Sequence, residues 1–338
     1  MPRARKHLLS PAAGGVGFYH CLSRVVDRNF VFQDREREMF RKIMRQVEAF
    51  SGVRVITWTI LSNHFHLLLE VPRAERLDDD EILERCRALY SAAGMVAVEW
   101  EFEDAKRNGA EAHDRWRAKY LKRMWDLSEF MKTLKQKFTS WFNRQHERVG
   151  TLWERRFTSV LVEGSWDCLL KVAAYIDLNS VRAGMVEDPK DYRWSGYAQA
   201  VAGDRLARRG LVSAMRRDDS KADWRKLGAA YRKIIFGIGE EGSMRVGVSS
   251  EEVAKVWAAG GRMSLAQLLR CRVRYFSDGV VIGGQVFVEG FFEARRAMFS
   301  ERRLTGARRL KGSGWGDLRV VRDLGVAPVV PPDRSGKP

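Results

Sequence analysis

Two β-rich runs around a two-residue turn constrain the fold of this chain more than any other feature. The runs are residues 53–61 (VRVITWTIL) and 64–71 (HFHLLLEV), and Ser62 and Asn63 separate them. Such runs joined by a short polar turn are typical of a β-hairpin. Pro72 follows directly and closes the second strand. We therefore expect a pair of antiparallel strands at residues 53–71.

The flanking sequence supplies further strands and helices in a recognisable order. Residues 15–26 predict a strand, 34–50 a helix with one apolar face, 155–163 an alternating strand, and 165–186 a helix that Ser165 opens and that ends near Gly184. The resulting β-α-β-β-α-β-α order predicts an α+β fold, with a ferredoxin-like (βαββαβ) antiparallel sheet and an additional helix. In this topology the strand at 64–71 is a central one.

The remaining segments suggest how the chain divides. Residues 78–125 are helical and charge-rich and predict one or two long helices, with a break near 126 where Asp126 and Glu129 could form a capping box. We expect an N-terminal domain at 1–200 with a helical insertion at about 73–125. A mainly helical, basic C-terminal region should follow at 201–325, and a flexible tail at 326–338. In the C-terminal region we expect helices from Ser249 and Ser264, and a turn, a short strand and a helix within 277–299.

Composition narrows the class of partner. The chain has 338 residues, and 60 Lys and Arg against 43 Asp and Glu give a formal charge of +17. This balance favours a polyanion such as nucleic acid or an anionic membrane. The sequence holds no apolar run of membrane-spanning length and no secretory signal, so we expect a cytoplasmic protein. Its four cysteines lie far apart, without CxxC spacing, and predict reduced, packed thiols.

Two histidines at the start of the second hairpin strand are candidate metal ligands. On a strand, residues i and i+2 point to the same face, so His64 and His66 present two imidazoles roughly 7 Å apart. Two imidazoles placed in this way can share one cation. The alternative is that both are satisfied polar residues at a strand end.

The helix predicted at 165–186 carries a second group of polar side chains. Tyr175 and Asn179 are at positions i and i+4 on one face, and Arg182 follows a turn later. Together with a histidine pair, this arrangement could supply a nucleophile and an oxygen ligand. Taken alone, Tyr175 is better explained as a half-buried residue of an amphipathic helix.

Four motifs, in this order, resemble those of the single-tyrosine HUH transposases, and among them the REP-associated tyrosine transposases. They are YHCLSR, LSNHFHLLLEVP, LSEFMKTLKQKFTSWFNRQHERVGTLWERRFTSVLVE and YIDLNSVRAG followed by DYRWSGY. The resemblance covers roughly residues 14–200, without about 73–125. It implies His64 and His66 as the metal pair, Tyr175 as the catalytic nucleophile and Asn179 as the third metal ligand. Ser180 replaces the proline that commonly follows this asparagine.

The resemblance implies metal-dependent cleavage and rejoining of single-stranded or hairpin-forming DNA in the bacterial nucleoid. A divalent ion, Mg²⁺ or Mn²⁺, would polarise a phosphate oxygen, and Tyr175 would displace the 3′ oxygen to give a 5′-phosphotyrosine. Because this bond conserves the energy of the phosphodiester, another 3′-OH could reverse the step without a nucleotide cofactor. The alternatives are a domesticated nucleic-acid-binding protein with little turnover and a rolling-circle nickase. The sequence does not decide between a monomer and a homodimer. It also does not decide whether Tyr175 acts with the histidines of its own chain or with those of a partner.

Basic residues interleaved with aromatic ones suggest where DNA binds. The candidate DNA contacts are Lys132, Lys135, Arg144, Arg148, Arg155 and Arg182. The aromatic residues that alternate with the basic ones at 132–148 also fit a packed core. A second basic tract could contact DNA or keep the chain soluble, and its members are Arg295, Arg296, Arg302, Arg303, Arg308, Arg309 and Lys311.

Overall fold

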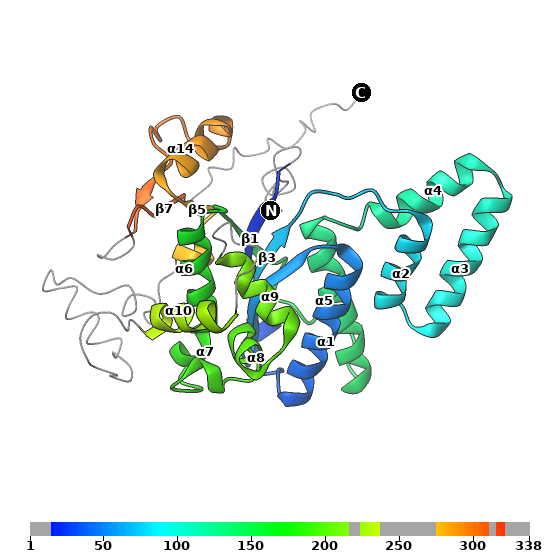
Figure 1. Cartoon of the computed structure of the whole chain (residues 1–338), viewed down its shortest axis with the longest axis horizontal. Coiled ribbons are helices and arrows are strands. Elements are labelled where there is room, and N and C mark those ends of the chain that lie inside the picture. Colours follow the sequence, from blue (N-terminus) through cyan, green and yellow to red (C-terminus); the bar gives the residue numbers. More distant parts are fainter. Residues whose placement is uncertain (1–14, 216–223, 237–274, 311–315, 322–338) are drawn as a thin grey trace, which may run out of the picture.

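One mixed sheet organises the computed structural model, which describes residues 15–215, 224–236, 275–310 and 316–321 (Figure 1). Within these residues the sheet has seven strands, in the order β2-β3-β1-β4-β5-β7-β6. The strands are β1 (Gly17–Arg24), β2 (Arg54–Ile60), β3 (His64–Val71), β4 (Thr158–Val162), β5 (Val281–Gly283), β6 (Arg308–Arg309) and β7 (Arg319–Val321).

The first four strands form the ferredoxin-like sheet that the element order predicts. β1 lies between β3 and β4 and pairs antiparallel with both, while β2 pairs antiparallel with the other side of β3. The β1–β3 register places Leu22 opposite His66 and Arg24 opposite His64. The fold is therefore α+β, and β3 is an interior strand, as expected.

Helices α1 (Asp34–Ser51) and α5 (Leu127–Gln145) cover one face of these four strands (Figure 1). The apolar residues of α1 recur every three or four positions, so they form one face that packs on the sheet. Phe40 of α1 and Phe138 of α5 are fully buried, and their ring centroids lie 5.2 Å apart. Phe65 of β3 packs against Phe40 at 4.5 Å. Each such buried aromatic ring contributes about 1.5–3 kcal/mol of hydrophobic stabilisation.

The insertion between β3 and α5 has three helices, so the prediction of one or two long helices was wrong. They are α2 (Asp79–Leu89), α3 (Ala92–Arg107) and α4 (Ala110–Leu121). Ser91 starts α3 by accepting a hydrogen bond from the backbone of Gly94, and Gly109, at a φ of 89°, turns the chain into α4. The expected break near 126 is confirmed, because the Asp126 carboxylate accepts from the Glu129 backbone at the start of α5.

The opposite face of the sheet carries a second layer of helices (Figure 1). They are α6 (Trp166–Asp177), α7 (Asn179–Arg182), α8 (Gly196–Ala202), α9 (Arg205–Ala214) and α10 (Trp224–Phe236). Gly210 lets α9 approach β2 closely, since a Cβ there would lie 2.4 Å from the carbonyl oxygen of Ile56. The single helix predicted at 165–186 is interrupted at Leu178, so Tyr175 lies on α6 and Asn179 on the short α7.

The described part of the C-terminal region adds strands to the same sheet. β5 pairs parallel with β4, and β7 pairs antiparallel with β5 and β6. The turn, short strand and helix expected within 277–299 are present as β5 and α14 (Gln285–Glu293), preceded by α13 (Tyr275–Asp278). The sequence did not predict β6 and β7. The helices expected from Ser249 and Ser264 and the tail at 326–338 lie outside the described residues, and the boundary at 200 stays a prediction.

Smaller features complete the description. Short 3-10 helices occur at Val26–Arg28, Pro189–Asp191 and Arg296–Met298. Cys21, Cys86 and Cys168 are buried free thiols, as expected, while Cys271 lies outside the described residues. In the part of the chain that the structure describes, no helix has the length and apolarity needed to cross a membrane.

Candidate active site on the β1–β3 face

The two predicted histidines lie side by side on the sheet face that α6 covers. Alternation along β3 sends Phe65 into the α1–α5 core and leaves His64 and His66 on the opposite face. Their ring centroids are 5.2 Å apart, at an interplanar angle of 71°. His66 is only 4% exposed, whereas His64 is partly accessible. The pair therefore sits at the border between core and solvent, with one imidazole reachable by a ligand.

A third histidine, which sequence reasoning did not include among the site residues, contacts this pair. His20 of β1 is 1% exposed, and its Nε2 lies 2.9 Å from Nδ1 of His66. Its Nδ1 lies 2.6 Å from the backbone carbonyl oxygen of Phe276. The motif YHCLSR already held a signal, because strand alternation puts His20, Leu22 and Arg24 on one face.

The predicted nucleophile reaches the histidines from α6. The ring of Tyr175 lies 6.4 Å from His66 and 6.1 Å from His20 between centroids. Phe276 stacks on the Tyr175 ring at 4.5 Å, and the guanidinium of Arg182 lies 4.0 Å above it. The tyrosine is 6% exposed. The structure thus brings Tyr175, His64 and His66 together within this chain.

Asn179, the predicted third metal ligand, serves the backbone of the tyrosine helix. Its amide nitrogen donates to the carbonyl oxygens of Tyr175, at 3.3 Å, and Ile176, at 3.2 Å. These carbonyls belong to the last turn of α6, where helical partners are missing. Ser180 beside it is buried, and its hydroxyl has no hydrogen-bond partner among the residues that the structure describes. Asn179 as a metal ligand stays a prediction.

The electrostatics of the site keep its imidazoles neutral. Burial lowers the pKa of His20 to about 4, and burial with the nearby Arg24 lowers the pKa of His64 to about 4. Burial also holds the pKa of His66 well below its usual value, with the other two histidines, Arg182 and Arg24 adding to the effect. Neutral imidazoles are the form that binds a metal ion, and the two arginines suit a phosphate.

The donor set therefore fits a divalent cation at His64 and His66. Among the described residues no group of three or more His, Cys, Asp and Glu side chains could hold a metal by itself. A cation here would need oxygen ligands beyond the two imidazoles, from Asn179, the DNA phosphate or water. Mg²⁺ and Mn²⁺ both accept oxygen ligands, and imidazole nitrogen suits Mn²⁺ better.

The predicted DNA contacts fall into exposed and anchored groups. Lys132 and Arg144 on α5 and Arg155 beyond it are exposed. Lys135 is anchored, because its ammonium donates to the Arg155 carbonyl and lies 5.2 Å from the Trp153 ring, and burial lowers its pKa to about 8. The Arg148 guanidinium donates a hydrogen bond to the backbone carbonyl oxygen of Thr151, in the same turn. Contact with DNA stays a prediction for all of them.

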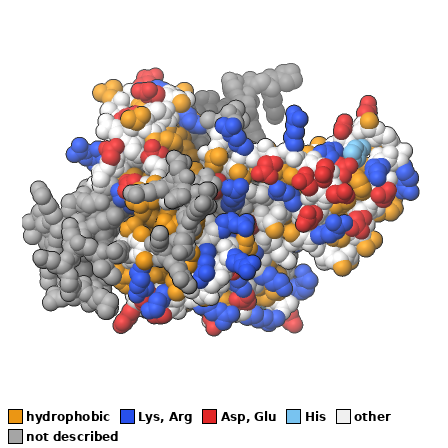
Figure 2. All heavy atoms as spheres, in the orientation of Figure 1, with side chains coloured by type: hydrophobic (Ala, Val, Ile, Leu, Met, Phe, Trp, Pro, Cys, Tyr) orange, Lys and Arg blue, Asp and Glu red, His pale blue; other side chains and the backbone are white. Residues whose placement is uncertain are grey.

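The second basic tract follows α14. Arg296 and Arg303 donate to backbone carbonyls of their own loop, and Arg295 lies 4.6 Å from the ring of Phe291. Arg302, Arg308 and Arg309 are exposed, while Lys311 lies outside the described residues. Figure 2 shows Lys and Arg side chains along the middle of one face, and mixed charges over the α2–α4 insertion.

A buried carboxylate, also missed from the sequence, fixes the end of α6. Asp177 is fully buried and accepts hydrogen bonds from the Thr57 hydroxyl at 2.7 Å, the Tyr231 hydroxyl at 2.6 Å and the backbone of Tyr197. Burial raises its pKa to about 7, although these hydrogen bonds oppose the rise. Nothing in the local sequence distinguishes Asp177 from a solvent-facing aspartate.

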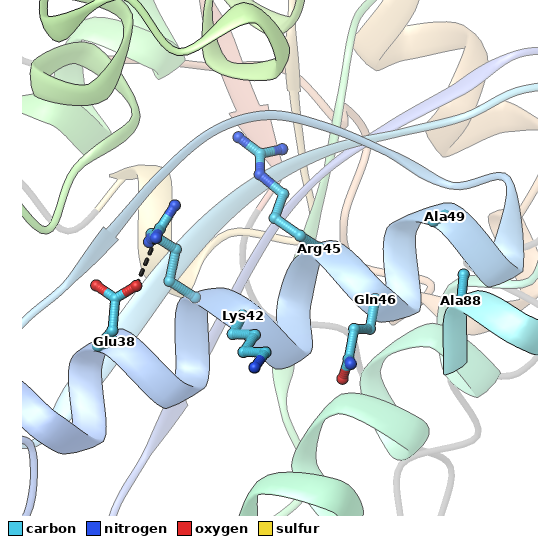
Figure 3. A pocket seen from close by; sticks show the side chains of 7 residues that line it. Glu38, Lys42, Arg45, Gln46, Ala49 and Ala88 are labelled. Atoms are coloured by element: carbon cyan, nitrogen blue, oxygen red, sulfur yellow. Dashed lines mark hydrogen bonds and ion pairs between the residues drawn. The ribbon is translucent and has the colours of Figure 1, made fainter. Parts of the chain in front are cut away.

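A shallow surface hollow lies away from this site, on the outer side of α1 (Figure 3). Arg41 there pairs with Glu38, and Arg45 pairs with Glu48. Ala88 of α2 completes the wall. Its arginines are ion-paired, and the hollow is separate from the histidines and Tyr175.

The fold and the site together define a class: a ferredoxin-like sheet with a His-x-His pair facing a tyrosine on an added helix. Residues 17–121 match the model of the family described as IS200-like transposases. The matched segment contains His64 and His66 and ends before Tyr175. For this segment, the match confirms the resemblance inferred from the motifs.

Two other comparisons complete the picture. The chain is similar to a solved structure described as a REP-associated tyrosine transposase bound to a REP hairpin, with 16% sequence identity and a TM-score of 0.33. The match covers 62% of this chain and 89% of that one. Comparison with curated proteins gives no match.

Proposed function

We propose that this protein is a metal-dependent DNA strand transferase that cuts and rejoins single strands through a covalent bond to Tyr175. The observation that carries the proposal is the position of the Tyr175 ring, against His66 and His20 and beneath the guanidinium of Arg182. The family match to IS200-like transposases supports the same class of reaction. The substrate we propose is single-stranded or hairpin-forming DNA.

The reaction needs one nucleophile and a means of stabilising charge on phosphate. The Tyr175 oxygen forms a bond to phosphorus and the bond from phosphorus to the 3′ oxygen breaks, so the phenol loses its proton and the 3′ oxygen gains one. The product is a 5′-phosphotyrosine with a free 3′-OH. A second 3′-OH then attacks the same phosphorus and releases the tyrosine, which conserves the number of phosphodiester bonds.

The residues around the tyrosine have separate tasks. Arg24 and Arg182 flank the histidines and would stabilise the negative charge that develops on the phosphate oxygens. A divalent ion held by His64 and His66, with Asn179 as the proposed third ligand, would act as a Lewis acid on a non-bridging oxygen. Burial of Tyr175 and His66 would limit the access of water, which would otherwise compete with the incoming 3′-OH.

Replacing the tyrosine tests this proposal. A hairpin DNA labelled at its 3′ end, incubated with Mn²⁺, should give a labelled protein band that survives denaturation. Tyr175→Phe should abolish the band and leave DNA binding within about twofold, because it removes only the nucleophilic oxygen. Tyr197→Phe is the matched control, since Tyr197 is a buried tyrosine on the same side of the sheet.

The outcomes separate the alternatives. A band that persists in Tyr175→Phe would show that another residue is the nucleophile. Tight binding without any band in the natural protein would favour a domesticated DNA-binding protein. Cleavage with a covalent band, but without joining to a second labelled 3′-OH strand, would favour a nickase.

A further inference from the structure

The hydrogen bonds of His20 fix the position of its proton. The backbone carbonyl oxygen of Phe276 can only accept, so Nδ1 of His20, 2.6 Å away, must carry a hydrogen and donate it. The His20 side chain is almost wholly buried, and burial disfavours the charged imidazolium. Neutral His20 then has a lone pair on Nε2.

That lone pair determines the tautomer of His66. Nε2 of His20 and Nδ1 of His66 are 2.9 Å apart, with the ring planes 22° from parallel. Because His20 Nε2 accepts, His66 Nδ1 must donate. The remaining nitrogen of neutral His66, Nε2, is then left with its lone pair, which is the atom that can bind a cation.

His64 is held in the same tautomer by a different neighbour. The Asn63 amide nitrogen donates to the carbonyl oxygen of Arg28 at 2.9 Å, which assigns the other end of the amide as the oxygen. This oxygen lies 2.7 Å from Nδ1 of His64, so His64 donates from Nδ1. His64 therefore also keeps its lone pair on Nε2.

We propose that His20 is a positioning residue of the metal site. Its hydrogen bond to the Phe276 carbonyl fixes the tautomer of His20, and His20 in turn fixes the tautomer of His66, which leaves His66 Nε2 available to the cation. Asn63 does the same for His64. The inference rests on the proposed function for the presence of a cation, and it extends the site beyond the matched segment. Phe276 is 256 positions from His20, so the C-terminal region takes part in organising the ligands.

Ligand-orienting partners of this kind commonly affect metal affinity by 10–100-fold. His20→Leu should therefore lower the affinity for Mn²⁺ about 10–100-fold, measured without DNA from the electron paramagnetic resonance signal of free Mn²⁺. His20→Gln should recover part of the loss, because its side-chain carbonyl can accept from His66. His113→Leu, on α4 in the insertion, is the control and should bind as the natural protein does.

A second measurement does not depend on how the variants fold. In the natural protein with ¹⁵N-labelled histidine and no metal, long-range ¹H–¹⁵N spectra should show His20, His64 and His66 as neutral Nδ1–H tautomers. An Nε2–H tautomer for His66 would overturn the inference. So would equal Mn²⁺ affinity in folded His20→Leu and the natural protein, or a loss in His20→Gln as large as in His20→Leu.

The proposed strand transfer and the proposed role of His20 can be tested independently of each other. Both measurements can be made in the Tyr175→Phe background, where no covalent step occurs. Loss of the DNA adduct with an intact His20 effect on Mn²⁺ would leave the positioning role standing. A normal adduct with no His20 effect would leave strand transfer standing and remove His20.

Discussion

Asn179 has a structural role at the end of the tyrosine helix, and its role as a metal ligand stays a prediction. Its amide nitrogen donates to the carbonyls of Tyr175 and Ile176, which end α6. Each carbonyl also has another donor, Arg182 for the first and the Thr59 hydroxyl for the second. With the amide nitrogen committed to the backbone, only its oxygen is suited to a cation.

Replacing Asn179 should therefore have two measurable effects. Asn179→Ala should lower the free energy of unfolding by about 0.5–1.5 kcal/mol, because both carbonyls lose one donor but keep another. The residue is only 8% exposed, so the mild stabilisation expected for an exposed helical position does not apply. If Asn179 is the third ligand, Mn²⁺ affinity should also fall. Urea unfolding and Mn²⁺ titration measure the two effects, and Asn108→Ala on the exposed insertion is the control. Unchanged Mn²⁺ binding would remove Asn179 from the ligand set.

At the scale of elements, hydrogen bonds of the last residue of α6, Asp177, hold the tyrosine helix in place. Asp177 joins the end of α6 to Thr57 on β2, to Tyr231 on α10 and to the start of α8. A pKa of about 7 in the folded protein means that this carboxyl holds its proton at a pH where the unfolded chain has lost it. The attachment of α6 therefore depends on pH.

Stability should consequently fall as pH rises towards 7. An acid whose folded pKa is about 7, against 3.8 in the unfolded chain, contributes about 4 kcal/mol that is present below pH 4, declines between pH 4 and 7, and is lost above pH 7. The difference in free energy of unfolding between the natural protein and Asp177→Asn should decrease over this range. Val172→Ala, a buried substitution on α6 without a titrating group, is the control. A pH-independent difference for Asp177→Asn would contradict the prediction.

The elements that the sequence predicted well are those with a local signal. Period-two alternation placed His64 and His66 on one face of β3, and the apolar stripe of α1 defined its buried side. The break at Leu178 and the third helix of the insertion were missed because several neighbouring residues are compatible with a continuous helix. His20, Asp177 and Phe276 were missed because their partners lie 46, 120 and 256 positions away, which no local pattern encodes.

At the scale of the whole molecule, distant parts of the chain share one sheet and one site. β5 and β7 extend the sheet from β4, and Phe276, just before β5, packs on the tyrosine of α6. On the face drawn in Figure 2, the described Lys and Arg side chains lie over several elements rather than on one helix. If the proposed DNA substrate binds, its attraction should therefore come from the folded molecule, with each exposed cation contributing a small part.

The dependence of DNA binding on salt measures how many of these cations contact phosphate. For single-stranded DNA, the slope of log K against log salt concentration is about −0.7 for each phosphate neutralised. If Arg144 on α5 contacts one phosphate, Arg144→Ala should make the slope less negative by about 0.7 and weaken binding at low salt more than at high salt. Lys106→Ala, on exposed α3 of the insertion, should leave the slope unchanged if the insertion does not bind the strand. Fluorescence anisotropy with a labelled hairpin, in the Tyr175→Phe background and without metal, isolates binding from cleavage. An unchanged slope in Arg144→Ala would place the DNA path away from α5, and a change in Lys106→Ala would extend the path onto the insertion.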